Sequence, residues 1–317
     1  MQGQPAKPAP VYKEAPFFKR LAIDLQKHKY KYLLILPIIV YLILFCYKPM
    51  YGLVIAFKNY RPTRGIWGSN WVGFLWFETF FKDPYFWRLL RNTFTISGLT
   101  ILFGFPAPII LALLLNEVRS NKFKRTVQTI TYMPYFISLV VTCSLLKIYC
   151  MENGLFPQIM ELFGAQRQNL LANPKYFYPI YILSDIWQGI GWNSIIYLAA
   201  LSGIDQEQYE AARIDGANRL QQVIHITLPG LMPTITILFI LRMGNILNVG
   251  YEKILLLYNP STYEVADVLS TYTYRTGLEN QQYSLSTAVG LFNTMVNVVF
   301  LLITNYISKK STESGLF

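Results

Sequence analysis

Charged residues, cysteine and histidine are scarce in this sequence, and each shortage argues against a class of protein. Only 14% of the 317 residues are Asp, Glu, Lys or Arg, whereas a soluble domain carries about 25%. The three cysteines, Cys46, Cys143 and Cys150, form no CxxC pair, and only two histidines are present. We therefore expect neither a disulfide framework nor a metal site, and the low charge argues against a soluble protein.

The sequence also lacks the motifs of nucleotide-binding and hydrolytic sites. It contains no G-x-x-x-x-G-K-[ST] loop, no HExxH and no GxSxG. Acidic residues are few and scattered, so no pair of carboxylates indicates a catalytic centre. The net charge of +11 accompanies no module of basic and aromatic residues that would bind nucleic acid. We expect a chain without catalytic residues, without a cofactor of its own and without a nucleic-acid partner.

Long apolar runs are what the sequence has in abundance. Hydrophobic residues make up 53% of the chain, and its mean hydropathy is +0.31. The runs approach the length of about 20 residues that a helix needs to cross a bilayer. We therefore predict an all-α polytopic membrane protein with about six transmembrane helices. The predicted spans are residues 32–47, 94–115, 130–150, 177–201, 231–249 and 285–307, and a continuation of the first span through 50–57 after Pro49 stays open.

Basic residues predict the orientation of these spans. Cations cluster before the first span, between the second and third spans and after the last span, which places both termini in the cytoplasm. The external segment 58–92 is rich in cations against this rule, and its tryptophans favour the outer membrane interface. We expect a cytoplasmic tail over 1–31 in which 17–31 can form an interfacial helix, a transmembrane domain over 32–309, and a cytoplasmic tail over 310–317.

A polar stretch over 203–233 separates the fourth and fifth predicted spans and has the pattern of two short helices joined by a bend. Two residue pairs have capping-box spacing, Asp205 with Gln208 and Asn218 with Gln221. Gly216 supplies a helix stop between the two pairs. Glu210 can pair with Arg213 at i+3 or with a cation on another protein. From composition alone, a solvated connecting loop is an equally good interpretation.

Two ionisable residues lie inside predicted spans. Asp185 belongs to the fourth span and Arg242 to the fifth, and at 1.5 Å per residue both lie about 10–12 Å from the outer edge. A lone charge at such a depth costs about 3 kcal/mol. We therefore expect that they bond each other or face a polar cavity; the alternative is that one or both lie nearer the interface.

Amide and aromatic side chains gather in the same three spans. They are Trp187, Gln188, Trp192 and Asn193 in the fourth span, Asn245 and Asn248 in the fifth, and Asn293 and Asn297 in the sixth. Aromatic faces together with amides suit a sugar, which has apolar CH faces and many hydroxyls. Hydrogen bonding between helices is the better interpretation of any single Asn. Taken together, the residues predict a substrate pathway with a cavity in the outer half of the membrane.

The polar stretch carries a family resemblance. Glu210-Ala211-Ala212, followed by Gly216, Ile226 and Pro229, resembles the EAA loop of ABC-importer permeases. From residue 32 to the C-terminus the chain is similar to type I ABC-importer permeases of the carbohydrate (MalF/LplB-like) class. The nearest subgroup is the LplB-like permeases linked to uptake of complex oligosaccharides or polysaccharide fragments. The resemblance is carried by residues 47–60, 104–138, 184–219 and 251–275. One departure is Pro157. The pattern has Gly-x-x-Asn here, with Gly154 as its glycine, so an Asn is expected where this sequence has Pro157.

The resemblance implies a function and a set of partners. We expect a multi-pass permease of the bacterial cytoplasmic membrane that imports an oligosaccharide by alternating access. Its partners would be a second related permease, an extracytoplasmic solute-binding protein and a cytoplasmic ATPase dimer that holds ATP and Mg. The loop over 203–229 would couple to the ATPase through Glu210, Ala211, Ala212, Asp215, Gly216 and Ala217. The alternatives are an ion-coupled secondary transporter and a membrane-embedded glycan-modifying enzyme.

Overall fold

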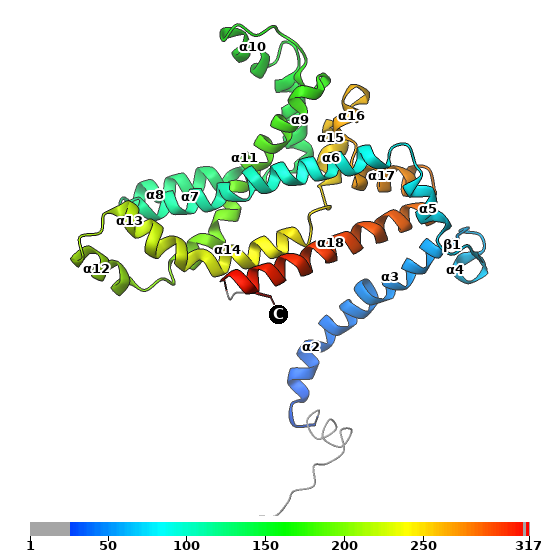
Figure 1. Ribbon diagram of the computed structural model, residues 1–317, viewed down its shortest axis with the longest axis horizontal. Helices are drawn as coiled ribbons and strands as arrows, with labels where there is room; N and C mark the ends of the chain where they lie inside the picture. Colours follow the sequence, from blue (N-terminus) through cyan, green and yellow to red (C-terminus); the bar gives the residue numbers. More distant parts are fainter. Residues whose placement is uncertain (1–25, 313–314, 317) are drawn as a thin grey trace, which may run out of the picture. The chain divides into compact units, whose positions relative to one another are not determined.

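The computed structural model describes residues 26–312 and 315–316, and these residues are mainly helical (Figure 1). The predicted all-α class is confirmed, because the described strands form only one two-stranded hairpin. The chain divides into two compact units, residues 1–54 and 55–317. Most of the predicted interfacial helix over 17–31 lies outside the described residues.

The first unit contains the first predicted span. An apolar helical run extends over Lys29–Phe57, so the first span does continue to residue 57, the alternative left open from the sequence. Pro49 does not interrupt the run, since Lys48 before it and Tyr51 after it keep right-handed helical backbone geometry. The segments of the run are α2 (Lys29–Tyr41), η1 (Leu42–Tyr47), α3 (Lys48–Met50) and η2 (Tyr51–Phe57).

The second unit opens with a small hairpin and a helix that carry the tryptophan-rich segment. The antiparallel pair β1 (Lys58–Asn59) and β2 (Asn70–Trp71) places Lys58 opposite Trp71. The hairpin encloses α4 (Gly65–Gly68) and is followed by α5 (Leu75–Phe81). The Trp76 indole N–H donates to the Lys58 carbonyl at 2.9 Å, which ties α5 to the hairpin.

The second predicted span is confirmed as a helical segment, and the third is wrong at its start. Residues Phe86–Glu117 form one long apolar segment built from α6 (Phe86–Leu99), η3 (Thr100–Gly104) and α7 (Pro106–Glu117). After α8 (Asn121–Tyr132) and η4 (Met133–Phe136), the backbone is extended at Ile137 and at Ser138, the N-cap of the next helix. The expected continuous helix over 130–150 is therefore broken, and α9 (Leu139–Cys150) begins anew.

The position of Pro157 follows from the next turn. Gly154 is the N-cap of α10 (Leu155–Leu162), and an added Cβ there would collide with the backbone of Ile148 and Tyr149. Pro157 then falls in the first turn of α10, where a backbone N–H needs no helical partner. The departure from the expected Gly-x-x-Asn pattern is compatible with this helix start.

The fourth predicted span is a helix, but it is less apolar than the others. It comprises α11 (Pro174–Leu201), 28 residues long, after η5 (Leu170–Ala172). Five described segments combine the length and hydropathy of a membrane span: Lys29–Phe57, Phe86–Glu117, Leu139–Glu161, Arg219–Met243 and Tyr283–Lys310. Helix α11 is not among these five, because its aromatic and amide side chains lower its hydropathy.

The fifth predicted span ends earlier than expected. After α12 (Gln206–Ile214), α13 (Arg219–Gln222) and η6 (Val223–Thr227), helix α14 (Leu228–Met243) stops at Met243 rather than at Val249. Residues 244–250 are irregular, so Asn245 and Asn248 follow the helix instead of lying within it. The sixth predicted span is confirmed within α18 (Tyr283–Thr312). Between them lie α15 (Tyr251–Leu257), η7 (Pro260–Thr262), α16 (Tyr263–Ala266), α17 (Leu269–Tyr274) and η8 (Arg275–Glu279).

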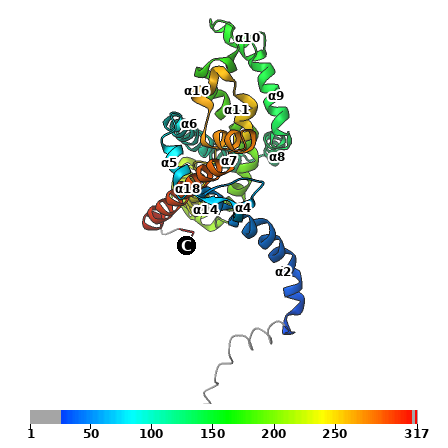
Figure 2. The same cartoon turned by 90° about the vertical axis from the view of Figure 1, so that its right-hand side faces the viewer.

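Helix α11 is the central element of the second unit. Its first half packs in a buried cluster with α15 through Phe177 and Ile254, and its second half packs with α7 and α14 through Tyr197 and Leu231. Figures 1 and 2 show α14 alongside α18. At Gly191, α11 approaches α8 so closely that an added Cβ would overlap the Thr131 carbonyl.

We predict that Gly191→Ala destabilises the protein, because α8 and α11 must move apart to admit the methyl group. Overpacking of this kind costs about 1–3 kcal/mol. Thermal melting of the purified protein in detergent measures the effect. Gly290→Ala is the matched control, since a Cβ at Gly290 in α18 meets no atom within 4 Å. Equal melting temperatures for the two variants would contradict the close packing.

Candidate functional site

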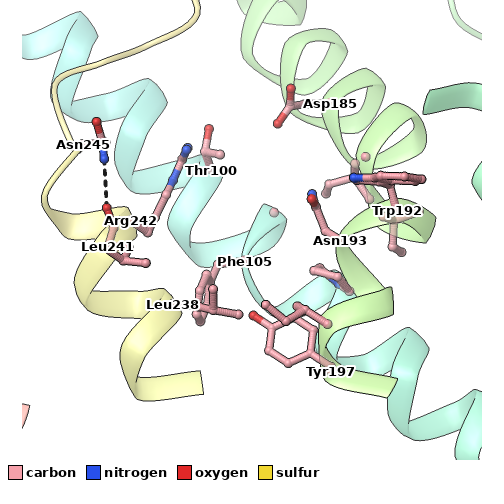
Figure 3. Close-up of a pocket in the computed structure, with 16 residues that line it drawn as sticks. Thr100, Phe105, Asp185, Trp192, Asn193, Tyr197, Leu238, Leu241, Arg242 and Asn245 are labelled. Carbon is pink, nitrogen blue, oxygen red and sulfur yellow. Dashed lines mark hydrogen bonds between the residues drawn. The ribbon is translucent and has the colours of Figure 1, made fainter. Parts of the chain in front are cut away.

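A polar cavity of about 590 Å³ lies between α11, the end of α14 and the η3–α7 segment (Figure 3). Asp185 and Asn193 reach it from α11, Arg242 and Asn245 from α14 and the residues after it, and Thr100 from η3. A second cavity of about 400 Å³ adjoins it, because Thr100, Asp185 and Arg242 line both. The two cavities together form a continuous polar region inside the second unit.

The expected pairing of Asp185 with Arg242 is wrong, because Lys253 takes the carboxylate. The Lys253 Nζ lies 3.3 Å from Asp185 Oδ1, and it donates to the Tyr181 carbonyl at 3.1 Å. Its side chain is 5% exposed, against 49% for Asp185. Burial lowers the pKa of the Lys253 ammonium, and the Asp185 carboxylate offsets part of that shift. Sequence reasoning missed Lys253 because it follows the fifth apolar run and gives no signal of burial.

Arg242 lies on the opposite wall from Asp185 in Figure 3. Within residues 26–312, the Arg242 guanidinium has no ion pair and donates no hydrogen bond to a protein group. The second part of the expectation, that the two charges face a polar cavity, is therefore confirmed. The Arg242 guanidinium keeps its hydrogen-bond donors available to a molecule in the cavity.

A chain of asparagines connects the cavity wall to α18. Asn245 donates to the Leu241 carbonyl, as Figure 3 shows. The remaining amide bonds run from Asn248 to Asn245 at 3.0 Å, from Asn293 to Asn248 at 3.2 Å, and from Asn297 to Asn293 at 3.1 Å. Asn245 and Asn248 line the two cavities, whereas Asn293 and Asn297 line neither. Asn293 and Asn297 therefore hydrogen-bond to other segments of the chain, which is the interpretation that the sequence favoured for any single Asn.

The aromatic candidates separate in the same way. Trp192 lines the first cavity, and its ring stacks on Tyr135 at 4.6 Å between centroids and 5° between planes. Trp187 faces a different, apolar cavity of about 740 Å³. Gln188 lines neither polar cavity; it donates to the Ile137 carbonyl at 3.0 Å, where the chain breaks before α9. The structure thus brings Trp192 to the polar region and leaves Trp187 and Gln188 outside it.

The loop between α11 and α14 forms the two expected helices. Asp205 caps α12 through the Glu207 N–H at 3.0 Å, so the expected capping box with Gln208 is wrong. Asn218 and Gln221 do form the expected capping box of α13.

Gly216 ends α12 as predicted. It adopts φ +80°, a conformation that glycine adopts without steric cost. Its N–H donates to the Arg213 carbonyl, and the Ala217 N–H donates to the Ala212 carbonyl at 2.8 Å. This pair of bonds is a Schellman motif, which fixes the bend between α12 and α13.

The bend is held to the helices on both sides of it. Tyr209 Oη lies 3.0 Å from Thr227 Oγ1 in η6, and Arg219 lies 4.0 Å from Glu117 at the end of α7. Glu210 has no ion pair in the described part of the chain, so the possible pairing with Arg213 is absent. Local hydrogen bonds and these two contacts give the loop a defined shape.

The outer surface of the bend is exposed, and small residues line part of it. It contains a hollow of about 280 Å³ bordered by four of the predicted coupling residues, Ala212, Asp215, Gly216 and Ala217. Glu210 and Ala211 are exposed beside it. Ile214 is 87% exposed, an unusual state for a large aliphatic residue on a helix. Among the described residues, no group of three His, Cys, Asp or Glu side chains could hold a metal ion.

Comparison with known proteins gives consistent matches over nearly the whole chain. The family model of the binding-protein-dependent transport system inner membrane component matches residues 104–313. The polygalacturonan/rhamnogalacturonan transport system permease protein YteP of Bacillus subtilis (strain 168) is 45% identical over 314 residues, covering 99% of this chain and 98% of that protein. Protein LplB of the same organism is 44% identical over 294 residues, covering 92% of each chain.

A solved structure matches equally well. A chain in the crystal structure of a bacterial ABC transporter involved in the import of the acidic polysaccharide alginate has a TM-score of 0.85 and 44% sequence identity. The match covers 92% of this chain and 99% of that chain. The type I permease fold of this neighbour agrees with the helical arrangement described above.

We predict that Asn297→Leu destabilises the segment that carries Asn245 to the cavity. Asn297 Oδ1 accepts from the buried Leu247 N–H at 2.9 Å, and an unpaired buried N–H costs about 1–3 kcal/mol. The melting temperature of the purified permease should fall accordingly. Thr294→Val, one turn away, is the control, because Thr294 is exposed and bonds only its own helix. Unchanged melting of Asn297→Leu would contradict this role.

Proposed function

This chain belongs to the family of binding-protein-dependent transport system inner membrane components, and we propose that it carries an oligosaccharide derived from an acidic polysaccharide. It is a multi-pass inner-membrane permease of a carbohydrate ABC importer and not an enzyme. The membrane-embedded glycan-modifying enzyme and the ion-coupled transporter are thereby set aside. The acidic class is supported by the relatives, since alginate is an acidic polysaccharide and polygalacturonan is a polymer of a uronic acid.

The polar cavity is the observation that carries the proposal. Its wall combines the side chain of Trp192, whose ring stacks on Tyr135, with the amides of Asn193 and Asn245, and it also presents charged groups. An aromatic face contacts the CH surface of a sugar ring, while amides serve both as donors and as acceptors for hydroxyls. A helix bundle in lipid retains such groups where they face a water-filled or substrate-filled space.

The energy for transport enters from another polypeptide in this proposal. The sequence has no phosphate-binding loop, so ATP and Mg would be bound by a cytoplasmic ATPase dimer. The bend at Gly216 and the hollow beside it would receive a side chain of that ATPase, with Glu210 meeting a cation there. The loop, and with it both termini, would face the cytoplasm. Movement of the ATPase would then shift α11 and α14, which flank the cavity, in alternating access.

Two further partners complete the proposed importer. A second related permease would supply the other half of the pathway, because a single chain exposes many of the apolar residues in its spans. An extracytoplasmic solute-binding protein would deliver the cargo, as the description of the family indicates. Substrate thus passes from the binding protein through the paired permeases without any covalent change.

We predict that deletion of this permease abolishes uptake of acidic oligosaccharides. The test measures uptake of galacturonate and mannuronate oligomers of about two to five residues, with neutral galactose and glucose oligomers beside them. Uptake in the deletion strain should return when the permease gene is restored. If only the neutral oligomers depend on the permease, the acidic class is wrong, while a carbohydrate importer remains.

We predict that Ala212→Leu uncouples the permease from its ATPase, because the larger side chain fills the hollow. A blocked interface pocket typically lowers binding by more than about tenfold. Copurification of the ATPase and ATP hydrolysis in proteoliposomes measure the effect. The control is Gln206→Leu, an exposed position of α12 outside the hollow. Normal coupling in Ala212→Leu would show that the ATPase binds elsewhere.

A further inference from the structure

We propose that Arg242 binds a carboxylate of the transported oligosaccharide, and that Lys253 keeps Arg242 available by holding Asp185. This inference rests on the proposed function, since it requires an acidic cargo in the cavity. It assigns a carboxylate subsite to the first cavity and a positioning role to a residue in α15.

The first step is that Asp185 is already neutralised. Lys253 is nearly completely buried, and three interactions fix its ammonium: the Asp185 carboxylate, the Tyr181 carbonyl and the Tyr181 ring, 4.6 Å away. Without Lys253, the Asp185 carboxylate would be open to Arg242, because both residues line the same two cavities. The ion pair between the buried Lys253 and the half-exposed Asp185 therefore leaves the Arg242 charge without a compensating partner in the described residues.

The second step is the chemistry of the guanidinium. Arginine stays protonated at every physiological pH, and its planar fork of N–H donors matches a carboxylate in a bidentate arrangement. In the first cavity the charged residues are Arg242 and the neutralised Asp185. The second cavity also contains Glu252, whose charge opposes an anion. The carboxylate subsite therefore lies on the side of Arg242 that faces Asn193 and Trp192.

The third step is that Arg242 is held by a fixed segment. Its carbonyl accepts the Asn245 N–H at 3.0 Å, and Asn245 is the end of the asparagine chain that reaches α18. Because this backbone is already ordered, only the Arg242 side chain loses conformational entropy when it binds an anion. The surrounding amides and the Trp192 ring contact the neutral parts of a sugar. Arg242 is then the residue that distinguishes an acidic sugar from a neutral one of the same shape.

The first experiment compares two forms of the same substrate in the complete importer. Galacturonate and mannuronate oligomers are supplied as free acids and as their methyl esters, which keep the sugar shape and remove the charge. Arg242→Gln should lower uptake of the acids by about 10- to 100-fold, the range expected for a hydrogen bond to a charged group. Uptake of the esters should stay within about twofold. Arg242→Lys should fall between these values, because it keeps the charge but loses the fork.

The control for that experiment is Arg64→Gln, which removes an exposed arginine from the hairpin region. It should leave uptake of both forms unchanged. Equal loss of acid and ester uptake in Arg242→Gln would overturn the proposal and indicate a structural role. Unchanged acid uptake would overturn it as well. If the wild-type importer carries the esters but not the acids, the acidic class of the proposed function fails first.

The second experiment tests the role of Lys253 by a pair of variants. Lys253→Met should release Asp185 to Arg242 and lower uptake of the acids while uptake of the esters is kept. Asp185→Asn combined with Lys253→Met removes both charges, so acid uptake should recover to within about threefold of wild type. ATP hydrolysis by the reconstituted importer confirms that each variant is assembled. A double variant as defective as Lys253→Met would overturn the positioning role.

Discussion

A membrane interior offers no hydrogen bonds to a protein, and this constraint explains how the cavity is built. At two places where the backbone leaves helical geometry inside the second unit, side chains from other elements bond the freed backbone groups. In the irregular segment 244–250, Ser97 donates to the Ile246 carbonyl, Asn297 accepts the Leu247 N–H, and Ser270 donates to the Val249 carbonyl. The break before α9 is met in the same way by Gln188. These contacts allow the helices to end early.

The early end of α14 is what forms the polar region. Because the helix stops at Met243, the residues after it turn toward α15 and α18 instead of continuing through the bundle. Asn245 and Asn248 then line the two cavities, with Arg242 beside them. The charge on the opposite wall is the Asp185 carboxylate of α11, which forms an ion pair with Lys253 of α15. A cavity whose wall carries one cation without a protein partner thus follows from the same hydrogen-bonding constraint.

The loop between α11 and α14 obeys a different and more local rule. Its helices are too short to be stable alone, so caps and contacts to the spans determine its shape. The Schellman motif at Gly216 and the capping box at Asn218 act within a few residues. Tyr209 and Arg219 then join the loop to η6 and α7. These two contacts connect the loop to segments that continue into the helices around the cavity.

The sequence by itself determined the features that depend on neighbouring residues. The apolar runs, the stop at Gly216, the second capping box and the family pattern were all readable, because each is an interaction over a few positions or a composition of one segment. Even here, the box at Asp205 was wrong, since the carboxylate can accept from either of two adjacent N–H groups.

Only the tertiary structure decided which partner each membrane charge takes. Asp185 and Lys253 are separated by 68 positions, and no periodicity of either segment indicates that they meet. The same holds for Leu247 and Asn297, 50 positions apart. Pairing in the membrane depends on where helices stop and which faces pack together, and that geometry is a property of the folded bundle as a whole.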